Sequence, residues 1–258
     1  MGKATATEIA VERLEASAYT VPTDSPESDG TLSWDSTTIV VVGATGGGKR
    51  GLGYTYGDVS VGTFVESKLA GVVEGTEAMS PPAAWAAMQR AIRNAGRPGV
   101  GAMAVSAVDV ALWDLKARLM KVPLADALPR FHAAVPVYGS GGFTSYSDGQ
   151  LEGQLGGWAS EGIPRVKMKV GREPERDRAR IGVAREAIGD GVELLVDANG
   201  AYTRKQALYW AEAFAEEGIT YLEEPVSSED REGLRLLRDH GPGGSPSPQV
   251  NTSGPCPN

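Results

Sequence analysis

The chain has 258 residues, of which 41% are hydrophobic and 22% are charged, and these proportions are ordinary for a globular protein. Its formal net charge is −8, from 25 basic and 33 acidic residues, which argues against nucleic-acid and anionic-membrane partners. The sequence has no apolar run near the roughly 20 residues of a membrane span, no signal-peptide core and a single cysteine, so we expect a cytoplasmic protein.

Two stretches near the amino terminus have the composition of β-strands. They are residues 9–18 and 36–42, and the second contains the run Thr-Thr-Ile-Val-Val-Val. Residues 22–30 lie between them and are rich in Pro, Ser and Asp, which indicates a polar loop.

The pattern changes to helix after residue 80. Residues 83–95 follow a Ser-Pro-Pro sequence that suits a helix start, and residues 102–120 carry apolar side chains at spacings of three and four. Residues 1–133 are therefore predicted to form an α+β domain with an antiparallel sheet and helices.

The glycine-rich segment Gly43–Lys49 allows two interpretations. Its glycine and lysine spacing, directly after a strand, matches a phosphate-binding P-loop, which makes a nucleotide-binding protein the alternative function. Arg50 stands where a P-loop needs Ser or Thr, and residues 51–57 suit a returning strand better than a helix. We therefore favour a hairpin turn between antiparallel strands.

Residues 134–240 repeat a strand followed by a helix. A short strand is expected at 135–139, and further strands end at Lys169, Asp197 and Glu223, with 26 to 30 residues between corresponding positions. Such a repeat predicts parallel strands and is typical of a (β/α) barrel, here with about four βα units.

Four charged side chains are expected at the carboxyl ends of these strands, where ligands of parallel sheets bind. Lys167 and Lys169 alternate with Met168 and so point to one face. Asp197 and Glu223 end the next two strands and offer the hard oxygen ligands that Mg²⁺ prefers. Two bases that face carboxylates indicate a metal and a proton to be moved.

Two polar residues are expected beside these ligands. Asn199 shares a face with Asp197 if the strand runs straight, where its amide can bond substrate or water. Glu224 then faces away from Glu223 and is expected to support the site without binding the metal.

The Lys-x-Lys, Asp-Ala-Asn and Glu-Glu-Pro elements, in this order, resemble the mandelate racemase/muconate lactonizing branch of the enolase superfamily over residues 8–240. The resemblance implies a capping domain and a TIM-type barrel, Mg²⁺, and abstraction of a proton α to the carboxylate of a small hydroxy acid or sugar acid. It does not separate racemase, dehydratase and cycloisomerase. It also implies that a longer parent protein forms a homo-oligomer.

The resemblance assigns roles to individual residues. Lys169 would be the general base, Lys167 would hold the charge state of the base and contact the substrate carboxylate, and Asp197 and Glu223 would be the first two metal ligands. A nearby second ammonium would lower the pKa of a lysine toward neutrality. Residues 20–34 would cap the site.

The glycine-rich stretch 53–57 would also cap the site and select the substrate by the same resemblance. Its two aromatic side chains, Tyr54 and Tyr56, are the expected substrate contacts.

The chain departs from the family after His240. The third acidic ligand and the opposite acid or base are missing, and neither His132 nor His240 ends a strand. Residues 241–258 shift abruptly to Gly, Pro and Ser. One nucleotide sequence for 244–252 also encodes Ile-Ala-Val-Ala-Ala-Gly-Glu-Tyr in another frame, so we hypothesise a frameshifted, C-terminally truncated product.

A half barrel with two of three metal ligands has consequences for activity. The 258-residue chain is expected to bind Mg²⁺ weakly, to be poorly soluble and to be inactive, because two strand edges and an apolar interior stay open. A non-catalytic remnant that only associates with other chains is a further alternative.

Overall fold

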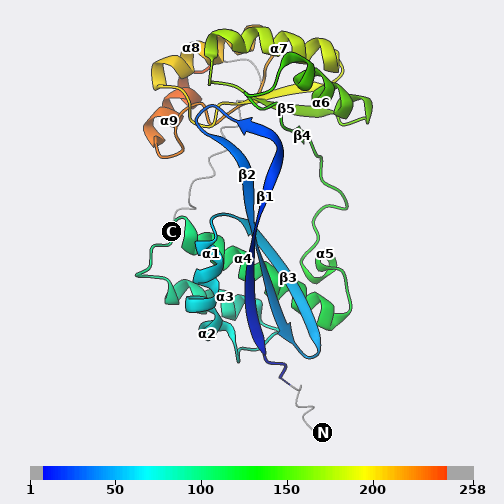
Figure 1. Ribbon diagram of the computed structural model, residues 1–258, viewed down its shortest axis with the longest axis vertical. Coiled ribbons are helices and arrows are strands. Elements are labelled where there is room, and N and C mark those ends of the chain that lie inside the picture. Colours follow the sequence, from blue (N-terminus) through cyan, green and yellow to red (C-terminus); the bar gives the residue numbers. More distant parts are fainter. Residues whose placement is uncertain (1–7, 243–258) are drawn as a thin grey trace. The chain divides into compact units, whose positions relative to one another are not determined.

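A computed structural model of the protein describes residues 8–242 (Figure 1). The described chain divides into two compact units. The first consists of the described residues up to Pro22 together with Ser36–Ala133, and the second consists of Thr23–Asp35 together with the described residues from Ala134 onward. The predicted domain limits at residues 133 and 240 stay a prediction, and the tail to which the frameshift hypothesis applies lies outside the described residues from position 243 onward.

The first unit contains helices and a three-stranded sheet, and two of these strands, β1 and β2, continue into the second unit. In chain order they are β1 (Arg13–Ser28), β2 (Ser33–Gly46), β3 (Lys49–Tyr56), α1 (Ser60–Phe64), the π-helix η1 (Val65–Leu69), α2 (Ala70–Val73), α3 (Pro81–Ala91), α4 (Val100–Met120) and α5 (Leu124–Ala127).

The three strands form a sheet in the order β1-β2-β3, and β2 and β3 are antiparallel. The predicted α+β class is confirmed. The predicted loop at residues 22–30 is wrong, because β1 continues to Ser28 through two prolines. Its neighbour β2 supplies a pairing partner that local composition does not reveal. The short helices between Ser60 and Val73 were not predicted.

The glycine-rich segment forms a tight hairpin. Gly46 pairs with Lys49, and Gly47 and Gly48 between them have φ values of 55° and 71°. Two consecutive residues with positive φ define the turn that matches the twist of a two-residue hairpin. A strand, and not a helix, begins at Lys49, so the segment lacks the helix amino terminus that a P-loop uses to bind phosphate. The structure thus supports the hairpin interpretation over the nucleotide-binding alternative.

Two further glycines let β3 lie directly against the long helix α4. A β-carbon on Gly51 would collide with the carbonyl oxygen of Ala111, and one on Gly53 would collide with the carbonyl oxygen of Ala107. Around this contact, buried side chains of β2, η1, α3 and α4 form the core of the first unit. The sheet therefore packs one face against helices (Figure 1).

We expect Gly53→Ala to destabilise the first unit by about 1–3 kcal/mol, because the added methyl meets helix backbone that cannot rotate away. Gly71→Ala is the matched control: it lies in α2 of the same unit, and a β-carbon there meets no atom within 4 Å. Urea unfolding measures both. Equal midpoints for the two variants would contradict the close-packing argument.

The second unit alternates strands and helices. After the segment Thr23–Asp35, its elements are β4 (Gly139–Ser140), α6 (Asp148–Ser160), β5 (Arg165–Lys169), α7 (Pro174–Ile188), β6 (Glu193–Asp197), α8 (Arg204–Glu216), β7 (Leu222–Glu223) and α9 (Arg231–His240).

The strands form a parallel sheet in the order β4-β5-β6-β7, as expected for a partial α/β barrel. The first strand is shorter and later than predicted, since only Gly139 and Ser140 pair with β5. Thr203 and Gln206 form a capping box at the start of α8, and Gly218 has a φ of 71° just after that helix.

The helices of this unit lie on one side of the sheet (Figure 1). Val166, Met168, Leu194 and Val196 point into the core between sheet and helices, so the alternate residues of β5 and β6 face the other way. In the described part of the chain, no helix is long and apolar enough to cross a membrane.

Candidate active site

Four charged side chains meet where β5, β6 and β7 end. Lys169 is paired in register with Asp197, and Asp197 is paired with Glu223, so the three positions lie side by side across the sheet. The Nζ of Lys169 donates to Asp197 Oδ2 at 2.7 Å. The Nζ of Lys167 donates to Glu223 Oε2 at 2.5 Å and lies 3.3 Å from Asp197 Oδ2. Strand alternation thus predicted a group that the structure brings together.

This group is largely withdrawn from water. Lys167 is 5% exposed and Asp197 is 2% exposed. Burial acts to lower the pKa of Lys167, but the hydrogen bond to Glu223 and the charges of Asp197 and Glu223 outweigh it, so the pKa is raised. The ring of Tyr138 lies 5.3 Å from the same ammonium and adds a cation–π contact. Lys167 is therefore held as an ammonium ion.

Asn199 and Glu224 follow their strands with unusual backbone geometry. Their φ values are 48° and 40°, so neither strand continues straight and side-chain alternation does not apply to these residues. The backbone N–H of Asn199 donates to Asp197 Oδ1 at 3.0 Å, and its side-chain amide lies 3.5 Å from Glu224 Oε2. Asn199 Oδ1 is buried and accepts no hydrogen bond from residues 8–242.

Asp197 and Glu223 already bind one shared cation, and this contact shows whether their oxygens could also hold a metal ion. Asp197 and Glu223 both approach one cation, the ammonium of Lys167, so their oxygens converge on a single positive charge. This geometry and these hard donors fit two positions around Mg²⁺, whose remaining ligands in proteins are often water or substrate oxygens. Residues 8–242 contain no group of three or more His, Cys, Asp or Glu arranged to hold a metal.

The tip of the β1–β2 hairpin packs against the same strand ends within the second unit. Arg172 donates to the carbonyl oxygens of Asp29 and Leu32. The hydroxyl of Thr144 donates to the Asp29 carbonyl oxygen as well. A β-carbon on Gly30 would collide with the carbonyl oxygen of Ala198. Part of the stretch 20–34 is therefore held close to the Asp-Ala-Asn segment.

A buried ion pair behind the site was missed by sequence reasoning. Asp177 and Arg180 on α7 are both buried, and Arg180 Nη1 lies 3.5 Å from Asp177 Oδ1. Arg180 donates to the carbonyl oxygens of Lys169, Gly142 and Phe143, and so ties the end of β5 to the loop after β4. One signal was present: Asp177 occupies the same helix stripe as three buried apolar residues, Ile181, Ala184 and Ile188.

Because of the buried carboxyl of Asp177, we expect the free energy of unfolding to depend on pH. Burial raises its pKa to about 6, although the backbone N–H of Gly171 and the charge of Arg180 oppose the shift. Because an acid with a raised folded pKa binds its proton more tightly when folded, its stabilising contribution is complete below about pH 4 and is lost as pH rises through 6.

The measurement compares the native chain with Asp177→Asn by denaturant unfolding at several pH values. The difference in unfolding free energy, native minus variant, should fall by on the order of 3 kcal/mol from pH 4 to above pH 6. A difference that stays level or rises over this window would contradict the assignment.

Tyr54 and Tyr56 lie on β3 in the first unit and are 57% and 62% exposed. Their rings meet edge to face with centroids 6.4 Å apart. Their predicted contact with substrate stays a prediction.

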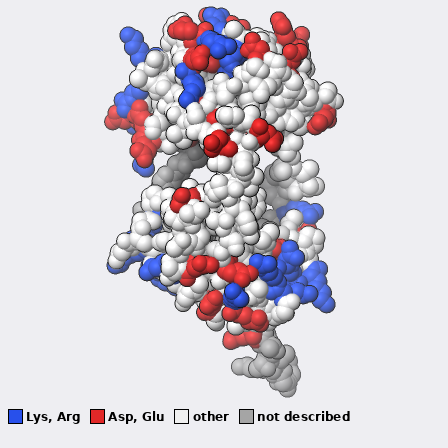
Figure 2. Space-filling model, viewed as in Figure 1, with Lys and Arg blue, Asp and Glu red and all other residues white. Residues whose placement is uncertain are grey.

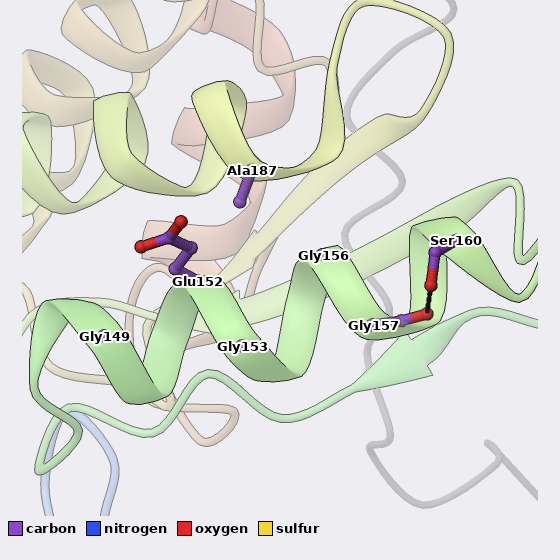
Figure 3. Close-up of a pocket in the computed structure, with 7 residues that line it drawn as sticks. All are labelled: Gly149, Glu152, Gly153, Gly156, Gly157, Ser160 and Ala187. Atoms are coloured by element: carbon purple, nitrogen blue, oxygen red, sulfur yellow. Dashed lines mark hydrogen bonds between the residues drawn. The ribbon is translucent and has the colours of Figure 1, made fainter.

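A shallow groove lies between α6 and α7, apart from the charged group (Figure 3). Small residues dominate its walls, and Glu152 is its one titratable residue. Its lining consists of Gly149, Glu152, Gly153, Gly156, Gly157, Ser160 and Ala187. The groove thus holds one titratable side chain and none of the four charged residues that meet at the strand ends.

Two family models match the chain. Residues 15–128 match the mandelate racemase/muconate lactonizing enzyme N-terminal domain, and residues 151–244 match the enolase C-terminal domain-like model.

Solved and characterised relatives agree with this match. A mandelate racemase/muconate lactonizing enzyme-like protein from Rubrobacter xylanophilus is 80% identical with a TM-score of 0.90, over 91% of this chain and 66% of that one. A 3,6-anhydro-alpha-L-galactonate cycloisomerase of Streptomyces coelicolor is 34% identical over 90% of this chain and 66% of its own length. A racemase from Streptomyces coelicolor with bound magnesium is 31% identical with a TM-score of 0.84, over 90% and 67%.

The chain thus spans about two thirds of the length of these relatives. Other similar structures hold magnesium together with small carboxylic acids, such as mandelic acid and L-glucarate. The N-terminal family model precedes the C-terminal model along the chain, and together they cover parts of both units. This chain belongs to the mandelate racemase/muconate lactonizing enzyme family of the enolase superfamily.

Proposed function

We propose that the residues of this chain serve, in a longer protein, the Mg²⁺-dependent removal of a proton α to the carboxylate of a hydroxy acid or sugar acid. One observation carries the proposal: Lys167, Lys169, Asp197 and Glu223 meet at the ends of three adjacent parallel strands. Two amines and two carboxylates in one buried group provide both a base and a cation site.

In this proposal the two lysines have different tasks. Lys169, which is bound to one carboxylate, would release that contact, lose one proton to solvent, and as the neutral amine accept the α-proton at its Nζ. Lys167 is held as an ammonium ion by two carboxylates and would contact the substrate carboxylate without giving up its proton. Different surroundings for two like groups are the usual basis for different acid–base roles.

Asp197 and Glu223 would hold the magnesium ion, and the bound ion would stabilise the negative charge that develops when the proton leaves. Asn199 would receive a hydrogen bond from a substrate hydroxyl, because its Oδ1 is buried and has no donor among the described residues. Glu224 would orient the Asn199 amide, which lies 3.5 Å from its carboxylate. Tyr54 and Tyr56 would contact the distal part of the substrate.

The reaction that follows proton removal is open among racemisation, dehydration and cycloisomerisation, because each begins with the same step. A non-catalytic remnant is the second candidate for this particular chain, since the described residues supply two carboxylate ligands and no third. In a longer protein, the third acidic ligand would come from the strand that follows β7.

Proton exchange in heavy water tests the proposal. Residues 1–240 would be joined to the remaining part of the Rubrobacter relative, which is 80% identical over the shared region. The fusion and the 258-residue chain would each be incubated with Mg²⁺ and a panel of α-hydroxy and sugar acids. NMR should show loss of the α-proton signal of an acid incubated with the fusion, and no such loss with the 258-residue chain. A fusion that folds, binds Mg²⁺ and exchanges no acid of the panel would contradict the proposal.

A further inference from the structure

Asp177 and Arg180 differ from the charged residues on the surface of the second unit. Figure 2 shows side chains of both signs close together on that surface, whereas Asp177 is 1% exposed and Arg180 is 6% exposed. Withdrawing two charges from water is costly, and apolar residues of similar volume often stabilise a fold as well as a buried ion pair does. Stability alone therefore does not explain the pair, and the backbone groups that it binds indicate another role.

The pair binds the backbone on both sides of the turn that follows Lys169. Arg180 Nη1 donates to the Lys169 carbonyl oxygen at 2.8 Å, and Asp177 Oδ2 accepts from the backbone N–H of Gly171 at 2.7 Å. Because one helix, α7, carries both partners, the chain between these two contacts is held at both ends. The pair thus determines where the end of β5 lies, and with it the origin of the Lys169 side chain.

Arg180 also holds the loop after β4. Its Nη2 donates to the carbonyl oxygens of Gly142 and Phe143 at 3.2 Å and 3.0 Å. The Gly142 oxygen accepts a second bond, from the backbone N–H of Lys169 at 3.0 Å. The loop and the strand end are therefore joined twice, once directly and once through the guanidinium. A single ammonium nitrogen cannot reproduce donors at two fixed positions.

The two segments that the pair holds also bind the hairpin tip, by which we mean residues 28–33. Thr144, directly after the loop carbonyls, donates its backbone N–H to the Ser28 carbonyl oxygen at 2.8 Å and its hydroxyl to the Asp29 carbonyl oxygen at 3.0 Å. Arg172, just beyond the end of β5, donates to the same Asp29 oxygen at 3.2 Å. The segments that lead to the proposed base therefore also carry the contacts of the tip.

A third segment completes this arrangement. The hydroxyl of Tyr202, three residues after Asn199, donates to Asp177 Oδ2 at 3.4 Å. In the same segment the carbonyl oxygen of Ala198 lies so close to Gly30 of the hairpin tip that a β-carbon there would collide with it. The pair thus contacts each of the three strand-end segments against which the tip packs.

From this geometry we infer that Asp177 and Arg180 are positioning residues, which hold the base Lys169 and the hairpin tip in one arrangement from the helix side of the sheet. Loss of the pair would displace the base and loosen the tip together. The role of Lys169 as the base rests on the proposed function. The coupling between the strand end and the tip does not depend on it.

Arg185 provides a matched control on the same helix. It also donates to two backbone carbonyl oxygens, those of Val192 at 3.3 Å and Gly218 at 2.8 Å. These residues precede β6 and β7, so they lie at the end of the sheet opposite the charged group. Arg180→Lys and Arg185→Lys are therefore the same chemical change at opposite ends of the same strands.

Amide hydrogen exchange of the 258-residue chain, measured by NMR at single residues, tests the coupling. We expect Arg180→Lys to speed exchange of the Thr144 and Lys169 amides about tenfold or more, because the first bonds the tip and the second bonds the loop. Arg185→Lys should leave both rates unchanged. If these amides exchange equally fast in the two variants, the inference is overturned.

A second variant covers the case in which a lysine replaces Arg180 too well. Asp177→Asn combined with Arg180→Met removes the pair without leaving an unpaired buried charge, and it should speed the same amides at least as much as Arg180→Lys does. Circular dichroism checks folding. If the double variant does not fold, Arg180→Lys decides, because it keeps a positive charge beside Asp177.

Kinetics of the extended fusion test the consequence for the base, with the panel acid that the native fusion exchanges fastest. Arg180→Lys should lower kcat about 10- to 100-fold and raise KM about threefold or more, because a displaced base slows proton transfer and a loosened tip weakens binding. Partial unfolding would lower the apparent kcat and leave KM unchanged.

The outcomes separate this inference from the proposed function. An active fusion that keeps its kcat and KM in Arg180→Lys would overturn the positioning role. A folded native fusion that exchanges no acid would contradict the proposed function alone, and the amide exchange of the 258-residue chain would then decide whether the pair couples the strand end to the tip.

Discussion

Lys169→Ala is expected to slow α-proton exchange by the extended fusion about 10²- to 10⁴-fold, the range typical for loss of a positioned general base. Lys169 is the lysine bound to one carboxylate, at 2.7 Å from Asp197, whereas Lys167 is bound between two. The variant removes the amine that would accept the proton and leaves both carboxylates in place.

Two comparisons make this result specific. Lys205→Ala, on the exposed side of α8 near its start, is a control for loss of a lysine and should exchange at the unmodified rate. Mg²⁺ affinity, measured by calorimetry, should persist in Lys169→Ala, because the two proposed ligands remain. Exchange that survives in Lys169→Ala would show that another group is the base.

Much of this site was predictable because strand alternation and parallel register are simple rules. Lys167 and Lys169 flank Met168, whose side chain is fully buried in the core, so both lysines had to face the other way. The carboxyl ends of neighbouring parallel strands lie side by side, which brought Asp197 and Glu223 to the same place. Local pattern was sufficient where the element is short and straight.

The sequence was less informative where long-range contacts decide the structure. Residues 22–28 contain two prolines and still form a strand beside β2. The end of β6 turns at Asn199 and Gly200, which have φ values of 48° and 78°, and the Asn-Gly pair that signals such a turn was not used in predicting where the side chains point. Arg180 donates to three carbonyl oxygens, one of them 11 residues away in the chain and two of them 37 and 38 residues away, which no spacing rule reveals.

The first unit shows the same division. The two-residue turn at Gly47 and Gly48 was correctly interpreted, since a Gly-rich stretch between strands favours positive φ. The need for glycine at Gly53 was not predictable, because it arises from the approach of α4 some 50 residues later in the chain.

A second large effect is expected from Lys167→Met, which shortens the side chain by one atom and removes its charge. Glu223 would lose its hydrogen-bonded partner in a poorly hydrated place, while Asp197 would keep Lys169. Breaking a buried ion pair on one side costs roughly 3–5 kcal/mol, so the second unit should unfold at clearly lower denaturant concentration.

The double variant Lys167→Met with Glu223→Gln separates this cause from simple loss of packing. Removing both charges leaves no unpaired ion, so the double variant should recover much of the stability lost in Lys167→Met. If the two changes are additive in denaturant unfolding, the ion pair does not couple them, and the argument from the 2.5 Å contact fails. If they couple as expected, each buried charge of this group is stabilised by the opposite charge beside it. The fold itself would be as stable with apolar residues at these positions, so the ammonium ion of Lys167 is explained by the site and not by stability.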